Sequence, residues 1–111
     1  MICKLAKIDE ISEGKWYEFN LQMDEGIFSL MLKKTKDTYF AFKNYCPHQG
    51  RRMNYSLGKF LTTQEGNIVC PAHGAEFKPE SGLCINGPCL GQSLEPVHIQ
   101  LNDESVFAIL K

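Results

Sequence analysis

Apolar and polar side chains alternate over two neighbouring stretches of the chain. Residues 28–33 alternate with a period of two, which is typical of a half-buried strand. A polar break at residues 34–37 follows, and residues 38–42 resume the apolar run, so the two stretches predict a β-hairpin. The side chains expected on one face are Phe28, Leu30 and Leu32, and those expected on the other are Ser29, Met31 and Lys33.

The rest of the chain carries similar short-strand signals. No segment sustains an apolar period of 3.6 residues, and residues 8–13 could form one helical turn at most. The sequence therefore predicts an all-β fold, a small sandwich or barrel. The remaining predicted strands are residues 14–19, a short hairpin at 62–69, and a hairpin formed by 97–101 and 105–110 around a turn at 102–104.

Length and composition describe an ordinary globular domain. The chain has 111 residues, of which 43% are hydrophobic and 23% are charged, so we expect one domain over residues 1–111. Twelve basic and thirteen acidic side chains give a net charge of −1, which provides no basic surface for nucleic acid. No apolar run approaches membrane-spanning length, and residues 1–7 lack the apolar core of a signal peptide. We therefore expect a cytoplasmic protein without nucleic-acid or membrane partners.

Two short clusters carry side chains that can bind metal. Cys46 and His48 form the first cluster, Cys70 and His73 form the second, and residues 49–69 lie between them. Both clusters belong to a glycine-rich stretch, about residues 44–91, in which strand signals are sparse. Because so many loops need something to order them, a metal centre between the two clusters is expected.

The cysteine count also favours metal binding. Five cysteines is an odd number, and two of them stand in mixed Cys/His pairs, which argues against a disulfide framework. Cys3, Cys84 and Cys89 are left over. Cys84 and Cys89 could bridge a small turn, but a reducing compartment favours two free thiols that pack as small apolar side chains.

Two thiolates and two imidazoles leave more than one metal centre open. Tetrahedral zinc accepts such a set, but zinc fingers usually pair cysteine with cysteine and histidine with histidine in separate knuckles. Here each loop supplies one residue of each type, so a binuclear centre could take both sulfurs on one iron and both nitrogens on the other. That arrangement is the ligand set of a Rieske [2Fe–2S] centre.

The sequence resembles the Rieske iron-sulfur domain family, and in particular its ferredoxins. The resemblance is carried by the pattern C-x-H at residues 46–48 and C-x-x-H at residues 70–73, with Phe77, Gly82 and the pair Gly87-Pro88 downstream. It implies stacked antiparallel sheets, with a loop-rich cluster-binding subdomain at about residues 44–91.

The resemblance further implies one [2Fe–2S] cluster and a role for each ligand. Cys46 and Cys70 would hold the buried iron, and His48 and His73 would hold the outer iron near solvent. Gly87 and Pro88 are expected in a third loop that shields the cluster from water, with a plain turn as the alternative.

The resemblance also gives an expectation for the reduction potential. With neutral imidazoles, two ferric ions, two sulfides and two thiolates carry no net charge, so histidine ligation makes an added electron less costly than it is in a four-cysteine cluster. High-potential family members add a disulfide and a serine hydroxyl beside the cluster, whereas the matching positions here are Arg51, Ala72 and Ala75. We therefore expect a potential near the low end of the Rieske range, about −150 mV.

These features predict an electron carrier and not a catalyst. A Rieske-type ferredoxin takes one electron from a reductase and passes it to an oxygenase or another redox enzyme, so both are expected partners. A Rieske oxygenase needs two more histidines and a carboxylate, and only His98 remains, for which a solvent-facing strand position is expected. The small subunit of an assimilatory nitrite reductase stays an alternative, as does a structural zinc module.

The basic side chains near the first cluster have more than one possible role, whereas the aromatic side chains have one. Lys43, Arg51 and Arg52 flank the first cluster, where they could dock an acidic partner. Alternatively they form an ordinary solvated patch or hold the loop through pairs with carboxylates. Four aromatic side chains are expected in the core: Trp16, Phe19, Tyr39 and Phe42.

Overall fold

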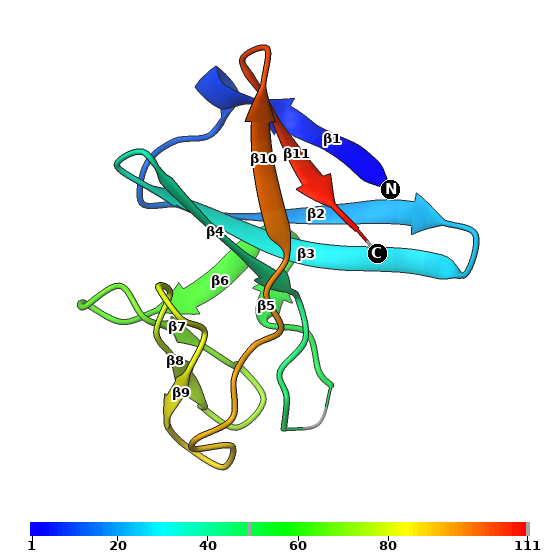
Figure 1. The fold of residues 1–111 in the computed structure, drawn as a ribbon. Helices are drawn as coiled ribbons and strands as arrows, with labels where there is room; N and C mark the ends of the chain where they lie inside the picture. Colours follow the sequence, from blue (N-terminus) through cyan, green and yellow to red (C-terminus); the bar gives the residue numbers. More distant parts are fainter. Residues whose placement is uncertain (49, 111) are drawn as a thin grey trace.

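The chain forms three antiparallel β-sheets that lie in layers (Figure 1). The computed structural model describes residues 1–48 and 50–110, and its antiparallel strands confirm the predicted all-β class. The elements are β1 (Ile2–Lys7), the 3-10 turn η1 (Ile8–Glu10), β2 (Trp16–Met23), β3 (Gly26–Thr35), β4 (Thr38–Lys43), β5 (Asn54–Ser56), β6 (Lys59–Thr62), β7 (Ile68–Val69), β8 (Glu76–Phe77), β9 (Cys84–Asn86), β10 (His98–Asn102) and β11 (Ser105–Ile109).

The first sheet joins the two ends of the chain in the order β1-β11-β10. β10 and β11 form the predicted C-terminal hairpin, and Asp103 and Glu104 make its turn with positive φ values of 50° and 64°. A two-residue hairpin turn requires this left-handed geometry because it matches the twist of the strands. β1 has no counterpart among the predicted strands; it pairs with the other edge of β11, where Ile2 lies opposite Ile109.

The second sheet, β2-β3-β4, is the middle layer. The β3–β4 hairpin confirms the predicted pairing, although β3 continues to Thr35 and leaves only residues 36–37 for the turn. The prediction that this strand is half-buried is wrong, because residues 29–33 are all buried. A separate core covers each face: Leu30 and Leu32 pack toward the first sheet, and Met31 packs toward the third.

Two polar side chains of β3 are buried because each finds a partner there. The Ser29 hydroxyl oxygen accepts a hydrogen bond from the Asn44 amide at 3.2 Å, and the Lys33 ammonium donates one to the Gly66 carbonyl at 3.3 Å. A buried polar group that keeps its hydrogen bonds avoids most of the cost of leaving water. Polar character alone therefore does not predict exposure on this strand.

The third sheet, β5-β6-β7-β8-β9, lies at the end of the molecule opposite β10 and β11 (Figure 1). β6 and β7 confirm the short hairpin predicted at residues 62–69. The five strands are only two to four residues long and fall within the predicted subdomain of about residues 44–91. Such short strands leave most of this region in loops, and these loops carry both Cys/His clusters.

The smaller fold expectations are also confirmed. Trp16 and Phe42 are buried, and Phe19 and Tyr39 are half-buried against the core on the first-sheet side of β3. His98 is exposed at the start of β10. The predicted helical turn is η1, and within the described residues no helix has the length and apolar character needed to cross a membrane.

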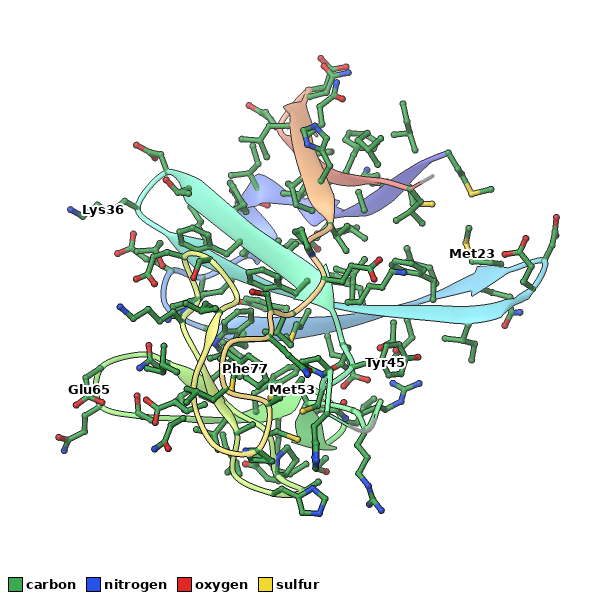
Figure 2. All side chains as sticks on the ribbon, turned by 60° about the horizontal axis from the view of Figure 1, so that its bottom comes forward. Met23, Lys36, Tyr45, Met53, Glu65 and Phe77 are labelled. Carbon is green, nitrogen blue, oxygen red and sulfur yellow. The ribbon has the colours of Figure 1, made fainter. Side chains whose placement is uncertain are left out.

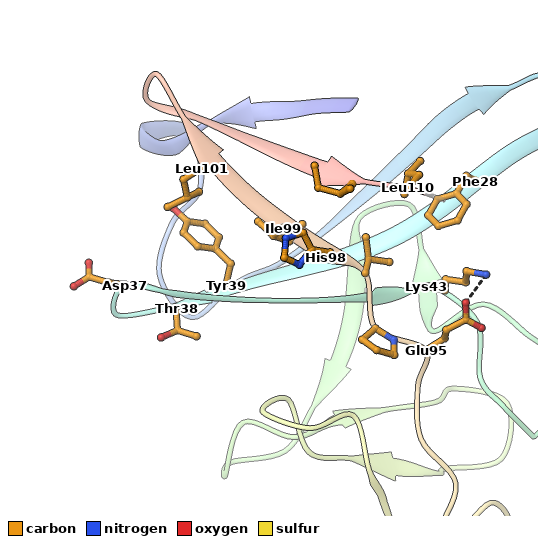
Figure 3. A pocket seen from close by; sticks show the side chains of 13 residues that line it. Phe28, Asp37, Thr38, Tyr39, Lys43, Glu95, His98, Ile99, Leu101 and Leu110 are labelled. Atoms are coloured by element: carbon orange, nitrogen blue, oxygen red, sulfur yellow. Dashed lines mark ion pairs between the residues drawn. The ribbon is translucent and has the colours of Figure 1, made fainter. Parts of the chain in front are cut away.

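A groove of about 840 Å³ opens between β4 and β10 (Figure 3). Its walls are mostly apolar, and an ion pair of 2.6 Å between the Lys43 ammonium and the Glu95 carboxylate lies at its edge. His98 lines this groove, whereas the cysteines and histidines of the two clusters do not contribute to its described lining. The groove is therefore separate from the Cys/His clusters.

We predict that Gly82→Ala destabilises the fold by about 2 kcal/mol or more. Gly82 has a φ of 76°, a left-handed conformation that costs an L-residue roughly 1–2 kcal/mol. A Cβ there would also lie 2.7 Å from Cε1 of the buried Phe42 ring, which adds an overpacking cost. The midpoint of urea unfolding measures the loss.

Gly58→Ala is the matched control for this prediction. Gly58 has a φ of 70°, but a Cβ built there meets no described atom within 4 Å. It should lose only the conformational term, about 1 kcal/mol. Equal losses in the two variants would contradict the proposed clash with Phe42.

Candidate metal centre

The two Cys/His clusters lie on loops with the same backbone pattern. In the first loop, residues 46–51, the Cys46 N–H donates to the Arg51 carbonyl at 2.7 Å, and the Gly50 N–H donates to the Cys46 carbonyl at 2.8 Å. In the second loop, residues 70–75, the corresponding bonds join Cys70, Ala75 and Gly74 at 2.7 and 2.9 Å. Each loop therefore closes on its own cysteine, and its histidine lies within the closed turn.

A glycine closes each loop for a conformational reason. Gly50 and Gly74 have φ values of 68° and 75°, which side-chain-bearing residues adopt only at a cost. Residues 78–83 repeat the same pair of hydrogen bonds with Gly82 but carry neither cysteine nor histidine. The turn is thus a general device of this region, and the side chains on it decide which turns form the candidate site.

The loops separate their sulfurs from their imidazoles. Cys46 and Cys70 are buried, with 3% and 2% of their surface exposed, while His48 and His73 are exposed. The two imidazole rings nevertheless face one another edge-on, with 5.2 Å between their centroids and 83° between their planes. The structure therefore brings together the four residues that the sequence predicted, as a buried sulfur pair and an exposed imidazole pair.

Both sulfurs of the pair belong to one buried core, which is a low-dielectric setting. Burial raises the pKa of the Cys46 thiol, a backbone hydrogen bond from His48 lowers it, and the neighbouring Cys70 side chain raises it again. Two thiolates would repel each other here. A bound cation removes that repulsion and replaces both protons, because coordination deprotonates a thiol outright.

The donor set matches a binuclear centre better than a single ion. Within the described residues, no three His, Cys, Asp or Glu side chains gather closely enough to hold one metal ion. A structural zinc site needs four ligands around one point. A Rieske cluster instead needs two sulfurs on one iron and two nitrogens on the other, which is the division observed here.

Buried polar contacts attach the first loop to the middle sheet. The Asn44 side chain is fully buried; its amide N–H group donates to the Ser29 hydroxyl at 3.2 Å and to the side-chain oxygen Oδ1 of Asn54 at 2.8 Å. Its own carbonyl oxygen accepts the Met53 N–H at 3.1 Å. Asn44 lies two residues before Cys46. It therefore connects the chain at the first loop to β3, β5 and Met53. In Figure 2, where this end of the molecule comes forward, Met53 lies inward beside Phe77.

Two of the basic residues around the first loop form ion pairs with carboxylates. Arg52 donates to the Glu18 carboxylate at 3.2 Å and to the Ser29 hydroxyl at 3.1 Å, and Glu18 also accepts the Gly58 N–H at 2.7 Å. The Glu18 side chain is only 2% exposed. For Arg52 the alternative of holding the loop through a carboxylate is therefore confirmed, whereas Lys43 pairs with Glu95 at an exposed position away from the loop. The guanidinium of Arg52 fastens the first loop to β2.

The second loop is the connection of the β7–β8 hairpin. Ile68 pairs with Phe77 and Val69 with Glu76, so the strands hold both ends of the loop together. A third loop, residues 84–92, lies against it: a Cβ built on Gly87 would be 2.7 Å from the Ala75 Cα. This contact is consistent with the expected shielding role of the third loop, and it explains why a glycine stands at this position.

Known proteins show the same combination of motif and fold. The family model described as "Rieske [2Fe-2S] domain" matches residues 1–104. The chain belongs to this family. Its members bind one [2Fe–2S] cluster, which confirms the predicted cofactor and decides against the structural zinc module.

Individual relatives agree with the ferredoxin resemblance. The ferredoxin component of the alkene monooxygenase system of Xanthobacter autotrophicus is 30% identical over 82 residues, which are 74% of this chain and 61% of that protein. The ferredoxin of carbazole 1,9a-dioxygenase from Nocardioides aromaticivorans IC177 superposes with a TM-score of 0.75 at 18% identity, covering 100% of this chain and 99% of that one.

A larger protein contains the same fold as one part. The terminal oxygenase of carbazole 1,9a-dioxygenase from Novosphingobium sp. KA1 matches with a TM-score of 0.79 at 17% identity, over 98% of this chain but only 29% of the oxygenase. The chain thus spans less than a third of that protein and about three fifths of the alkene monooxygenase ferredoxin. These similarities show the Rieske fold, and relatives that are ferredoxins serve as electron carriers.

Two further thiols of this Rieske domain lie beside the sulfur pair. Cys84 and Cys89 are unbridged and buried, with 3.3 Å between their sulfurs. Burial, followed by the neighbouring Cys84 and Cys46, raises the pKa of the Cys89 thiol to about 12. The two thiols are free and buried, as expected for small side chains packed in this turn.

We predict that Asn44→Ala destabilises the protein by about 2 kcal/mol. The change leaves the buried Met53 N–H and the Asn54 side chain without their partner, and an unsatisfied buried group costs roughly 1–3 kcal/mol. Thermal and urea unfolding measure the loss. Asn102→Ala, at an exposed position on β10, is the control and should stay within about 0.5 kcal/mol of the unsubstituted protein. A similarly small effect at Asn44 would contradict its role as the junction.

Proposed function

We propose that this Rieske domain is a one-electron carrier that receives electrons from a reductase and passes them to an oxygenase or another redox enzyme. The observation that carries the proposal is the exposed imidazole pair next to a buried sulfur pair. In this assignment Cys46 and Cys70 hold one iron, and His48 and His73 hold the other. The bound cluster supplies reversible one-electron chemistry at a potential raised by histidine ligation.

The proposed ligands have different roles in an electron carrier. The buried cysteines keep water away from the sulfur side, and the exposed histidines place the other side where a partner can approach. The turns that hold these four side chains are closed by backbone hydrogen bonds, and the first of them is anchored through Asn44 and Arg52. A rigid surround keeps reorganisation small when one electron is added or removed.

Names of relatives support the choice of partner. The alkene monooxygenase and carbazole dioxygenase systems each include a ferredoxin component, and solved complexes pair a carbazole dioxygenase oxygenase with its ferredoxin. We infer by analogy that the electron acceptor of this chain is an oxygenase. A cytoplasmic location and the single-domain organisation over residues 1–111 remain predictions.

We predict that the purified protein is red-brown and shows a near-axial EPR signal when reduced. Cys46→Ser, His48→Ala, Cys70→Ser and His73→Ala should each lose most of the iron, the visible absorption and the EPR signal. Iron and sulfide analysis with absorption and EPR spectroscopy checks this result.

Matched controls exist for both ligand types. Cys3→Ser, on β1, and His98→Ala, on β10, change the same residue types outside the two loops and should keep the full cluster. A colourless protein that contains zinc, or a cluster that survives loss of both histidines, would overturn the ligand assignment.

The environment of the sulfurs predicts a low reduction potential. Ala72 and Ala75 carry no polar side-chain atom, and Arg51 faces solvent, so none of them supplies the hydroxyl or disulfide of high-potential relatives. We expect a midpoint near the low end of the Rieske range, about −150 mV. A redox titration followed by visible absorption measures it, and Ala75→Ser, which adds a hydroxyl, should raise it. A midpoint above zero in the unsubstituted protein would refute the low-potential assignment.

A further inference from the structure

A buried lysine lies on the face of the middle sheet that is turned toward the third sheet. Lys33 is only 9% exposed, and its ammonium donates a hydrogen bond to the Gly66 carbonyl at 3.3 Å. Its cross-strand neighbours are Trp16 on β2 and Phe40 on β4, and the ammonium lies 5.8 Å from the centre of the Trp16 ring. Trp16 belongs to the core that contains the buried sulfur pair, and Phe40 packs against that core. The positive charge of Lys33 therefore lies beside the same core as the proposed ligand sulfurs.

The contacts of this ammonium carry no negative charge. Within the part of the chain that the structure describes, no carboxylate forms an ion pair with Lys33. The acidic side chains of the neighbouring segments are placed otherwise: Glu65 is exposed, and the Glu76 carboxylate accepts a hydrogen bond from the Asn67 amide at 2.7 Å. A carbonyl dipole and an aromatic face stabilise an ammonium without neutralising it. Lys33 thus keeps its net charge next to a low-dielectric core, where solvent and salt screen its field less than they do at the surface.

The bond between Lys33 and Gly66 places this charge near the second loop. Gly66 belongs to the turn of the β6–β7 hairpin, where its N–H donates to the Thr63 carbonyl at 3.0 Å and the Thr63 N–H donates to the Asn67 carbonyl at 2.9 Å. β7 then leads directly into Cys70. Because four residues of extended chain span at most about 14 Å, the ammonium lies within roughly 18 Å of the Cys70 backbone.

The charge of a Rieske centre makes this placement relevant to the reduction potential. With two thiolate and two neutral imidazole ligands, the oxidised cluster carries no net charge, and one added electron makes the net charge −1. A fixed positive charge in the surrounding protein therefore attracts the reduced form more than the oxidised form. Burial of that positive charge strengthens the difference.

We propose that the buried ammonium of Lys33 stabilises the reduced [2Fe–2S] cluster and thereby raises its reduction potential. The inference rests on the proposed function, because it needs a cluster bound between the two loops. It gives β3 an electrostatic role in addition to its structural one. Without this charge, the low reduction potential that we expect for the protein would be lower still.

The neighbouring Lys34 offers a matched control on the same strand. Its ammonium also lies 5.8 Å from an aromatic centre, that of Tyr39, but it projects from the opposite face of β3 and is only half-buried. Lys33→Met and Lys34→Met each remove one positive charge. We expect Lys33→Met to shift the reduction potential of the cluster-loaded protein downward and Lys34→Met to leave it nearly unchanged. Redox titration followed by visible absorption measures both values.

Two further variants separate the charge of Lys33 from its packing. Lys33→Arg keeps the charge and should restore most of the reduction potential that Lys33→Met loses. Lys33→Gln removes the charge but keeps an N–H donor, so it should show the same downward shift even if Lys33→Met does not fold. Urea unfolding of each variant reports the structural role separately, because a packing defect alone lowers stability without moving the reduction potential.

The dependence on salt gives a second readout. A buried charge is screened little, so the downward shift in Lys33→Met or Lys33→Gln should persist at high salt. An unchanged reduction potential in both variants, equal shifts at Lys33 and Lys34, or a Lys33→Arg value as low as that of Lys33→Gln would overturn the proposal. An unsubstituted protein that binds no [2Fe–2S] cluster would instead overturn the proposed function.

Discussion

The candidate site depends on a pair of hydrogen bonds that closes each Cys/His loop on its own cysteine. The Cys46 and Cys70 N–H groups each reach the carbonyl five residues ahead, and their own carbonyls each accept the N–H of a left-handed glycine. Because this closure is the same in both loops, it turns both sulfurs inward and leaves both imidazoles outside. The same backbone arrangement in both loops thus gives the buried and exposed halves of the proposed Rieske ligand set.

The middle sheet supplies the foundation on which these loops rest. β3 is buried on both faces, so it connects the core of the first sheet to the core that contains the four buried cysteines. The contacts between this sheet and the first loop are polar: Asn44 and Arg52 bond to residues of β2, β3 and β5. Such contacts fix direction as well as distance, whereas the short strands of the third sheet bury too little surface to do so alone. A bound cluster would complete this anchoring, since it ties the two loops to each other.

The environment of the proposed ligand sulfurs bears on the potential that we propose. Alanine at positions 72 and 75 puts no polar side-chain atom on the second loop, which favours a low potential. The contact between Gly87 and Ala75 sets how closely the third loop approaches this second loop.

The sequence by itself determined the candidate ligands, the all-β class and both long hairpins, because the spacing of the Cys and His residues and the period-two patterns are local properties of the chain. It could not supply the strand β1, which exists only by pairing with β11 from the other end of the chain. Nor could it show that β3 is covered on both faces, since Ser29 and Lys33 look solvent-facing until Asn44 and Gly66 are beside them. The same limit hid the packing of Gly87 against Ala75. Burial, hydrogen-bond partners and the meeting of distant loops are fixed by packing between layers, and only the tertiary structure decides them.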